Sequence, residues 1–164
     1  MSFGLKVSGY SVPVFNEREV RGAAGILFAA GLAAFMVAAT TGQQRPLQAF
    51  AMAFMLDMSV RLFISPRYSP TLAIARLVVR KHKPEYVGAQ QKKYAWGLGL
   101  GMAMISCFSL GLFGAPLALV LVMCSVCLVF LFLEAAFGIC VGCHLQRLFS
   151  KVEPQYCPGG VCER

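Results

Sequence analysis

The chain has 164 residues, of which 58% are hydrophobic and 13% charged, and its formal net charge is +8. A soluble domain carries about 25% charged residues, and a small one exposes too much surface to hide so many apolar side chains. The composition excludes an ordinary soluble domain and favours an all-α membrane protein. The positive charge does not indicate nucleic-acid binding, because the basic residues flank apolar stretches and form no compact patch with aromatic residues.

Four apolar stretches are each long enough for a transmembrane helix, which needs about 20 residues. In chain order they cover about residues 22–40, 47–64, 96–113 and 117–143. No signal-peptide cleavage pattern accompanies the first stretch, so we expect this helix to be retained. The expected fold is a four-transmembrane-helix bundle within a membrane domain over residues 1–147, followed by a flexible cytoplasmic tail over residues 148–164.

The distribution of basic residues predicts the orientation of the bundle. Thirteen Lys and Arg residues lie in the N-terminal segment, the loop between the second and third stretches, and the C-terminal tail. Arg45 alone lies in the two loops on the other side. Because basic loops are retained in the cytoplasm, we expect both termini and the long loop to be cytoplasmic.

The long loop itself contains a regular pattern. Residues 71–82 (TLAIARLVVRKH) place apolar side chains and Arg76 and Arg80 at helical spacing. This pattern is typical of an amphipathic helix that lies on a membrane surface. We therefore expect a short cytoplasmic amphipathic helix between the second and third transmembrane helices.

Three ionisable residues fall inside the predicted spans: Asp57 and Arg61 in the second, and Glu134 in the fourth. A charge at the centre of a bilayer costs about 3 kcal/mol on insertion scales, so such residues face other helices and pair. Asp57 and Arg61 are one helical turn apart, and Glu134 is expected at a similar depth, within reach of Arg61. We interpret this polar intramembrane cluster as a packing clasp, with a proton or substrate site as the alternative.

Pairs of glycines four residues apart are also present in the third and fourth stretches. Gly97 with Gly101, and Gly138 with Gly142, match the small-residue spacing that allows transmembrane helices to approach closely. This spacing predicts close helix packing at both pairs.

The seven cysteines divide into two groups. Cys107, Cys124 and Cys127 lie within predicted spans, where a cysteine is a small apolar side chain, and we interpret these three as packing residues. Cys140 and Cys143 lie where the fourth stretch ends, and Cys157 and Cys162 lie in the tail. A reducing cytoplasm disfavours stable disulfides among these four, which leaves thiol exchange, sulfur carriage or metal binding.

Several short motifs resemble the bacterial DUF4395 family of integral membrane proteins, over about residues 14–147. The motifs are Phe15-Asn16-Glu17 with Arg21, Leu56-Asp57 with Arg61-Leu62-Phe63, Ser65-Pro66-Arg67-Tyr68-Ser69-Pro70, and Leu133-Glu134-Ala135-Ala136-Phe137-Gly138 leading into Cys140-Val141-Gly142-Cys143. The resemblance implies a bacterial inner-membrane protein. Members of the family are encoded near rhodanese-type sulfurtransferases and thioredoxin-like proteins, which implies a role in sulfur or thiol traffic by association.

Three functions remain open on these observations. The first is a thiol module in which Cys140 and Cys143 exchange disulfide or sulfane sulfur with a thioredoxin-like or rhodanese-like cytoplasmic protein, while Cys157 and Cys162 act as resolving thiols. The second is a non-enzymatic membrane anchor or assembly subunit. The third is zinc or iron–sulfur binding by the same four cysteines, with His144 as a substitute ligand. No cofactor is predicted for the first two functions.

Overall fold

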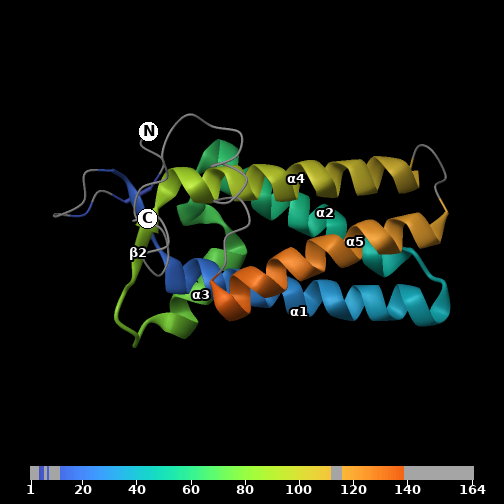
Figure 1. Ribbon diagram of the computed structural model, residues 1–164, viewed down its shortest axis with the longest axis horizontal. Helices are drawn as coiled ribbons and strands as arrows, with labels where there is room; N and C mark the ends of the chain where they lie inside the picture. The colour runs from blue at the N-terminus through green and yellow to red at the C-terminus, as the bar shows by residue number, and fades with distance from the viewer. Residues whose placement is uncertain (1–3, 6, 8–11, 112–115, 139–164) are drawn as a thin grey trace.

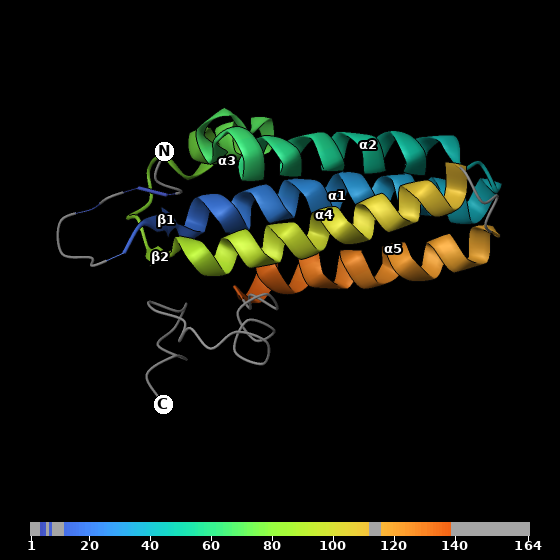
Figure 2. The same cartoon turned by 90° about the horizontal axis from the view of Figure 1, so that it is seen from above.

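Four long helices lie side by side in the computed structural model, which describes residues 4–5, 7, 12–111 and 116–138 (Figure 1). They are α1 (Glu17–Thr41), α2 (Arg45–Ser59) with its π-helical continuation η1 (Val60–Ile64), α4 (Ala89–Gly111), and α5 (Leu117–Phe132) with its π-helical continuation η3 (Leu133–Phe137). Helices α1 and α4 each contact both α2 and α5, so the four helices form a ring around a common core (Figure 2).

Three helical stretches in the described part of the chain are long and apolar enough to cross a membrane. They are Glu17–Thr41, Arg45–Ile64 and Leu117–Phe137, with 25, 20 and 21 residues. At 1.5 Å per residue each is about 30 Å long or longer, which is enough to cross the hydrocarbon core. These stretches match the first, second and fourth predicted spans, and they are consistent with a membrane protein.

The helix boundaries differ from the predicted ones at two places. Helix α4 contains the third predicted stretch but begins at Ala89, seven residues before residue 96. The helix of the fourth stretch ends at Phe137, because Gly138 adopts a left-handed conformation with φ of 67°. A left-handed residue terminates a helix, so the described helix ends within the predicted stretch of about residues 117–143, and residues 139–143 lie outside the described residues.

Local signals in the sequence explain where the elements begin. Asn16 caps α1 by accepting a hydrogen bond from the Arg18 N–H at 3.2 Å. Ser65 and Ser69 each cap a helix that starts with the following proline, the 3-10 turn η2 (Pro66–Tyr68) and α3 (Pro70–Val79). Proline is favoured at the first helical position because a backbone N–H would have no partner within the helix there, so its absence costs nothing. The two Ser-Pro pairs thus place two helix starts four residues apart.

One end of the bundle carries the remaining elements, and we call it the polar end. Here α1 and α4 begin, η1 and η3 end, and α3 packs against α1 (Figure 1). The strands β1 (Val14–Asn16) and β2 (Tyr86–Gly88) form a short antiparallel pair, and they directly precede α1 and α4 in the chain. Helix α3 confirms a helix within the predicted amphipathic segment 71–82, and it lies between η2 and β2 in the chain.

Gly31 on α1 lies where α2 and α5 approach α1 closely in the core. A Cβ atom at Gly31 would lie 2.7 Å from Cζ of Phe50 on α2 and 3.0 Å from Cδ2 of Leu128 on α5. A Cβ at Gly97 or Gly101 would meet no atom within 4 Å in the described part of the chain. The prediction of close helix packing at Gly97 and Gly101 is therefore wrong.

Candidate functional site

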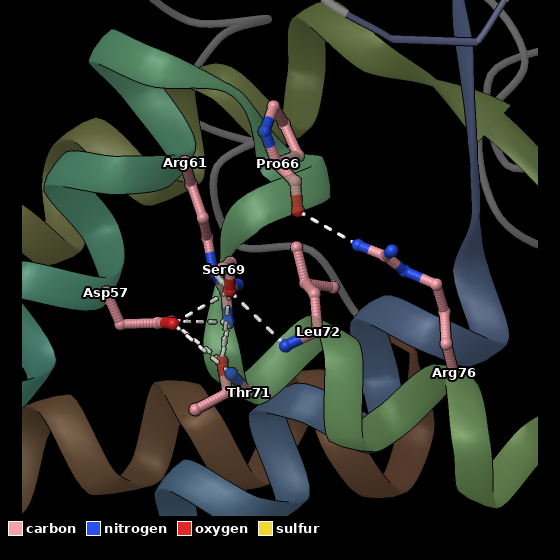
Figure 3. A network of polar contacts seen from close by, with 7 residues as sticks. All are labelled: Asp57, Arg61, Pro66, Ser69, Thr71, Leu72 and Arg76. Carbon is pink, nitrogen blue, oxygen red and sulfur yellow. Dashed lines mark hydrogen bonds and ion pairs between the residues drawn. The ribbon is translucent and has the colours of Figure 1, made fainter.

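Asp57 and Arg61 form a buried ion pair at the polar end of α2. Nη2 of Arg61 lies 2.7 Å from Oδ2 of Asp57, and the two side chains are 2% and 3% exposed. The hydroxyls of Ser69 and Thr71 each donate to the Asp57 carboxylate at 2.7 Å, and both accept a hydrogen bond from Arg61 (Figure 3). The guanidinium also lies 5.0 Å from the centre of the Trp96 ring, which favours a cation–π contact. We call Asp57, Arg61, Ser69 and Thr71 the clasp.

The clasp also determines where the loop after α2 lies. The Ser69 hydroxyl accepts the N–H of Leu72 at 3.3 Å, so the same side chain caps α3 and bonds Asp57. Arg76, one turn along α3, donates to the carbonyl of Pro66 at 3.1 Å (Figure 3) and also to the carbonyl of Arg67 at 3.1 Å. These hydrogen bonds hold η2 and α3 against the end of α2.

A second group of charged side chains lies at the same end, and we call it the end cluster. It consists of Glu17 and Arg21 from α1, Lys92 from α4 and Glu134 from η3. Nζ of Lys92 donates to Oε1 of Glu134 at 2.8 Å, and Lys92 is only 1% exposed. Glu17 is also buried, and its carboxylate interacts electrostatically with both Lys92 and Arg21. The end cluster therefore joins three helices and carries two charges of each sign.

Arg21 connects the end cluster to the end of the last helix. Its Nε donates to the carbonyl of Ala135 at 3.2 Å, and its Nη2 donates to the carbonyl of Ala136 at 2.7 Å. Carbonyls in the last turn of a helix have no partner within the helix, and a cation there also complements the helix dipole. A Cβ on Gly138 would lie 2.8 Å from Oε1 of Glu17, so the chain turns directly against this carboxylate.

The polar residues predicted from sequence are divided between these two groups. Asp57 and Arg61 form the expected pair, whereas the ion-pair partner of Glu134 is Lys92 rather than Arg61. Glu134 still contributes an electrostatic interaction at Arg61. From the sequence, Lys92 falls in the basic loop before the third apolar stretch, because a lysine is not expected within a membrane-spanning helix. In the structure it lies inside α4, which begins at Ala89.

Other members of the two groups were not identified from the sequence as site residues. They are Ser69, Thr71, Glu17 and Arg21. Ser69 and Thr71 flank Pro70 in the sequence, at a predicted helix start. This start follows shortly after a span that contains two charged residues, and that position is the signal that could have identified them. Glu17 and Arg21 are one turn apart at the start of α1, which could have suggested a shared face.

The cysteines predicted to carry chemistry lie outside the described residues. These are Cys140, Cys143, Cys157 and Cys162, together with His144. Cys107, Cys124 and Cys127 are described, are partly buried and form no disulfide. Within the described ranges, no group of three or more His, Cys, Asp and Glu side chains is arranged to hold a metal ion.

A comparison with protein families identifies one match that covers most of the chain. The model of a domain of unknown function, DUF4395, matches residues 15–151. The matched range contains the clasp, the end cluster, and Cys140 and Cys143, but not Cys157 or Cys162. Neither a curated protein nor a solved structure matches the chain.

The clasp predicts a strong difference between single and double substitutions. Arg61→Met leaves the Asp57 carboxylate buried without its cation, and we expect a loss of about 3–5 kcal/mol in unfolding free energy. Asp57→Asn combined with Arg61→Met removes both charges, keeps one acceptor oxygen for one of the two hydroxyls and offers an NH2 donor to the other, so the loss should be much smaller. Denaturant unfolding of the purified protein in detergent measures both, and equal losses would contradict the role of charge pairing.

Gly138 and Gly42 provide a matched test of the end cluster. Both glycines adopt a left-handed backbone, with φ of 67° and 71°, but a Cβ at Gly42 would meet no described atom within 4 Å. Alanine at either position costs about 1–2 kcal/mol for the backbone alone. Gly138→Ala must also displace the Glu17 carboxylate, so its melting temperature should fall further than that of Gly42→Ala. Equal shifts in thermal unfolding would show that Glu17 does not pack against this turn.

Proposed function

This chain belongs to the DUF4395 family, and we propose that it is a four-span bacterial inner-membrane protein that handles thiols or sulfane sulfur at its cytoplasmic face. Cys140 and Cys143 are the proposed reactive thiols, and Cys157 and Cys162 in the tail are the proposed resolving thiols. The proposed partner is a soluble thioredoxin-like or rhodanese-like protein.

The arrangement of α4 supports a fourth span. It has 23 residues, more than the roughly 20 that cross a hydrocarbon core, and it packs between two helices that are themselves long and apolar enough to span. Its exposed side chains include Leu98, Met104, Ile105 and Phe108. Large apolar side chains on the outside of a bundle are expected where the surrounding medium is lipid.

The position of α3 supports a cytoplasmic amphipathic helix. Leu72 and Ala75 are buried against the bundle, whereas Ile74, Leu77 and Val78 are exposed. Arg80 and Lys81 follow directly, and basic residues beside an exposed apolar face favour the surface of an anionic leaflet. The basic residues of the polar end agree with its assignment to the cytoplasm.

The observation that carries the proposal is that the end cluster holds the last turn before the cysteine motif. Gly138 lies against Glu17, Arg21 binds the two carbonyls just before Phe137, and Cys140 follows Gly138 by two residues. A reactive group needs a rigid support, and a helix end tied to two other helices provides one. A thiol pair at this point could be presented to a soluble protein without disturbing the apolar part of the bundle.

The chemistry requires only the thiols and the partner. In disulfide exchange, a Cys140 or Cys143 thiolate attacks the partner's disulfide, forms a mixed disulfide and releases one partner thiolate. The second thiol of the pair then displaces the remaining partner sulfur, so the partner is reduced by two electrons and the pair is oxidised. In sulfur transfer, the thiolate accepts the outer sulfur of a partner persulfide and the partner thiolate leaves.

A non-enzymatic anchor is the second candidate, and the clasp favours it. The Asp57 carboxylate receives hydrogen bonds from Arg61, Ser69 and Thr71, so this buried charge already has a structural role in packing. A structural clasp requires no substrate, and it would serve an assembly subunit equally well. Zinc or iron–sulfur binding by the cytoplasmic cysteines is the third candidate function. Metal analysis of the purified protein tests it.

Cysteine labelling tests the proposed orientation. In a chain with all seven native cysteines replaced by serine, Lys83→Cys should resist a membrane-impermeant maleimide in intact spheroplasts, because residue 83 is cytoplasmic. Gln43→Cys should react under the same conditions. Lysed spheroplasts provide the control, in which both positions should react. Labelling of Lys83→Cys in intact spheroplasts would overturn the orientation and place the cysteine motif outside the reducing cytoplasm.

Trapping with defined proteins tests the thiol function. The Cys143→Ser chain should form a mixed disulfide through Cys140 with a purified thioredoxin that lacks its resolving cysteine and carries thionitrobenzoate on its remaining cysteine, because the Cys140 thiolate displaces thionitrobenzoate as the leaving group. Alternatively, the same chain should accept labelled sulfur from a persulfidated rhodanese. Cys140→Ser with Cys143→Ser should abolish both reactions, whereas Cys107→Ser should leave them unchanged. If neither reaction occurs and the purified chain holds no metal, the anchor function replaces this proposal.

A further inference from the structure

A large groove lies at the polar end, outside the two groups of charged residues described above. Its volume is about 750 Å³, and small-molecule sites usually have about 300–1,000 Å³. Residues before α1 and in its first turn form one part of the lining, and the end of η1, the turn η2 and α3 form the other. We call it the end groove. No member of the clasp or of the end cluster lines it, so it needs an explanation of its own.

The end groove lies where two of the long apolar helices have their ends. Ile64 is the last residue of the second span, and Glu19 and Val20 lie in the first turn of the first. Ile64 and Tyr68 line the groove and are 62% and 71% exposed. In a bilayer the ends of spans lie beside the lipid headgroups, where tyrosine is enriched. In the proposed membrane placement the groove therefore opens at the level of the headgroups.

The lining of the end groove has an excess of positive charge. Its charged residues are Glu19, Arg67 and Arg76, so two cations and one anion give a net charge of +1. Glu19 pairs with Nε of Arg76 at 3.4 Å and accepts a hydrogen bond from Asn16 at 3.1 Å. The Arg67 side chain is exposed, and it has no hydrogen bond or ion pair within the part of the chain that the structure describes. Arg67 therefore carries the uncompensated charge.

Arg76 is held in place by the contacts that position η2. Its Nη2 donates to the carbonyls of Pro66 and Arg67, and its Nε faces Glu19. Its side chain is still 34% exposed, and its Nη1 has no partner among the described residues, so it retains donors for an anion. A guanidinium suits phosphate oxygens, and a fixed one loses little conformational freedom on binding. The groove thus combines one fixed and one exposed guanidinium.

The net charge of the lining favours one class of anion. A phosphodiester carries a single negative charge, which the lining balances, whereas a phosphate monoester carries about −1.5 to −2 at pH 7. Phospholipid headgroups contain a phosphodiester joined to apolar chains, and basic pockets beside transmembrane helices bind such headgroups. Leu56 and Phe63, which precede Ile64 on the same helix, are also exposed. The acyl chains of a lipid held at the groove would therefore find apolar contacts.

We propose that the end groove binds the headgroup of one anionic phospholipid. The phosphate is held by the guanidinium groups of Arg67 and Arg76, and the acyl chains extend along η1 and α2. A lipid bound there contacts both η2 and α3, and so adds to the hydrogen bonds that hold these elements against the bundle. This inference rests on the proposed membrane placement, but it does not depend on the thiol chemistry.

Native mass spectrometry of the purified full chain in a non-ionic detergent tests the site. The probes are phosphatidylglycerol, which is anionic, and zwitterionic phosphatidylcholine with the same acyl chains. We expect one phosphatidylglycerol per chain, and phosphatidylcholine should bind at least about fivefold more weakly. Arg67→Gln should weaken phosphatidylglycerol binding by about tenfold, as expected for the loss of a charge-assisted hydrogen bond. Its melting temperature without lipid should equal that of the native chain, because the Arg67 side chain has no described partner.

Arg80→Gln is the matched control, because Arg80 is also exposed at the polar end but does not line the groove. It should bind phosphatidylglycerol as tightly as the native chain. Equal weakening by Arg67→Gln and Arg80→Gln, or equal binding of the two lipids, would overturn the proposal. Deacylated phosphatidylglycerol is water-soluble and keeps the phosphodiester. If it bound as tightly as the lipid, the groove would be a site for a free anion and the proposal would be wrong. The trapping reactions of Cys140 are independent of these outcomes.

Discussion

Burying a charge in an apolar surrounding is the constraint on which the rest of this structure depends. Asp57, Arg61 and Lys92 are each at most 3% exposed, and Glu134 is largely buried beside them. An isolated charge in such a place is costly, whereas a paired and hydrogen-bonded one is tolerated. The chain meets this constraint with two groups at one end of the bundle. Between them, the clasp and the end cluster contain residues from every long helix.

The two groups act on different parts of the molecule. The clasp lies within a short stretch of chain, and it positions the turn η2 and the helix α3 that follow α2. The end cluster joins α1, α4 and η3, and it lies where the described part of the last helix ends. The π-helical segments η1 and η3 contain Arg61 and Glu134, respectively. Such segments change the direction of side chains relative to an α-helix and are frequent at functional sites.

Much of the fold follows from the sequence because it depends on apolar content and on local signals. Hydropathy predicted the apolar stretches, and the spacing of Asp57 and Arg61 predicted their pairing. The start of α4 could not be predicted in the same way, because Lys92 and Lys93 are typical of a loop unless a carboxylate from another helix neutralises one of them. The partner of Glu134 depends on how η3 turns and on where α4 begins. Both are properties of the assembled bundle, so residue spacing alone does not determine them.

The sequence separations within the two groups have a consequence for how the protein is made. Thr71 bonds Asp57 across only 14 residues, so the clasp can form while the later helices are still being synthesised. Arg21 bonds Ala135 across 114 residues, and Lys92 bonds Glu134 across 42, so the end cluster must wait for α5. Contacts between distant residues require the closure of long loops and form late. The end of η3 is therefore anchored only after α5 has been synthesised and has packed against α1 and α4, and a chain interrupted earlier would lack these contacts.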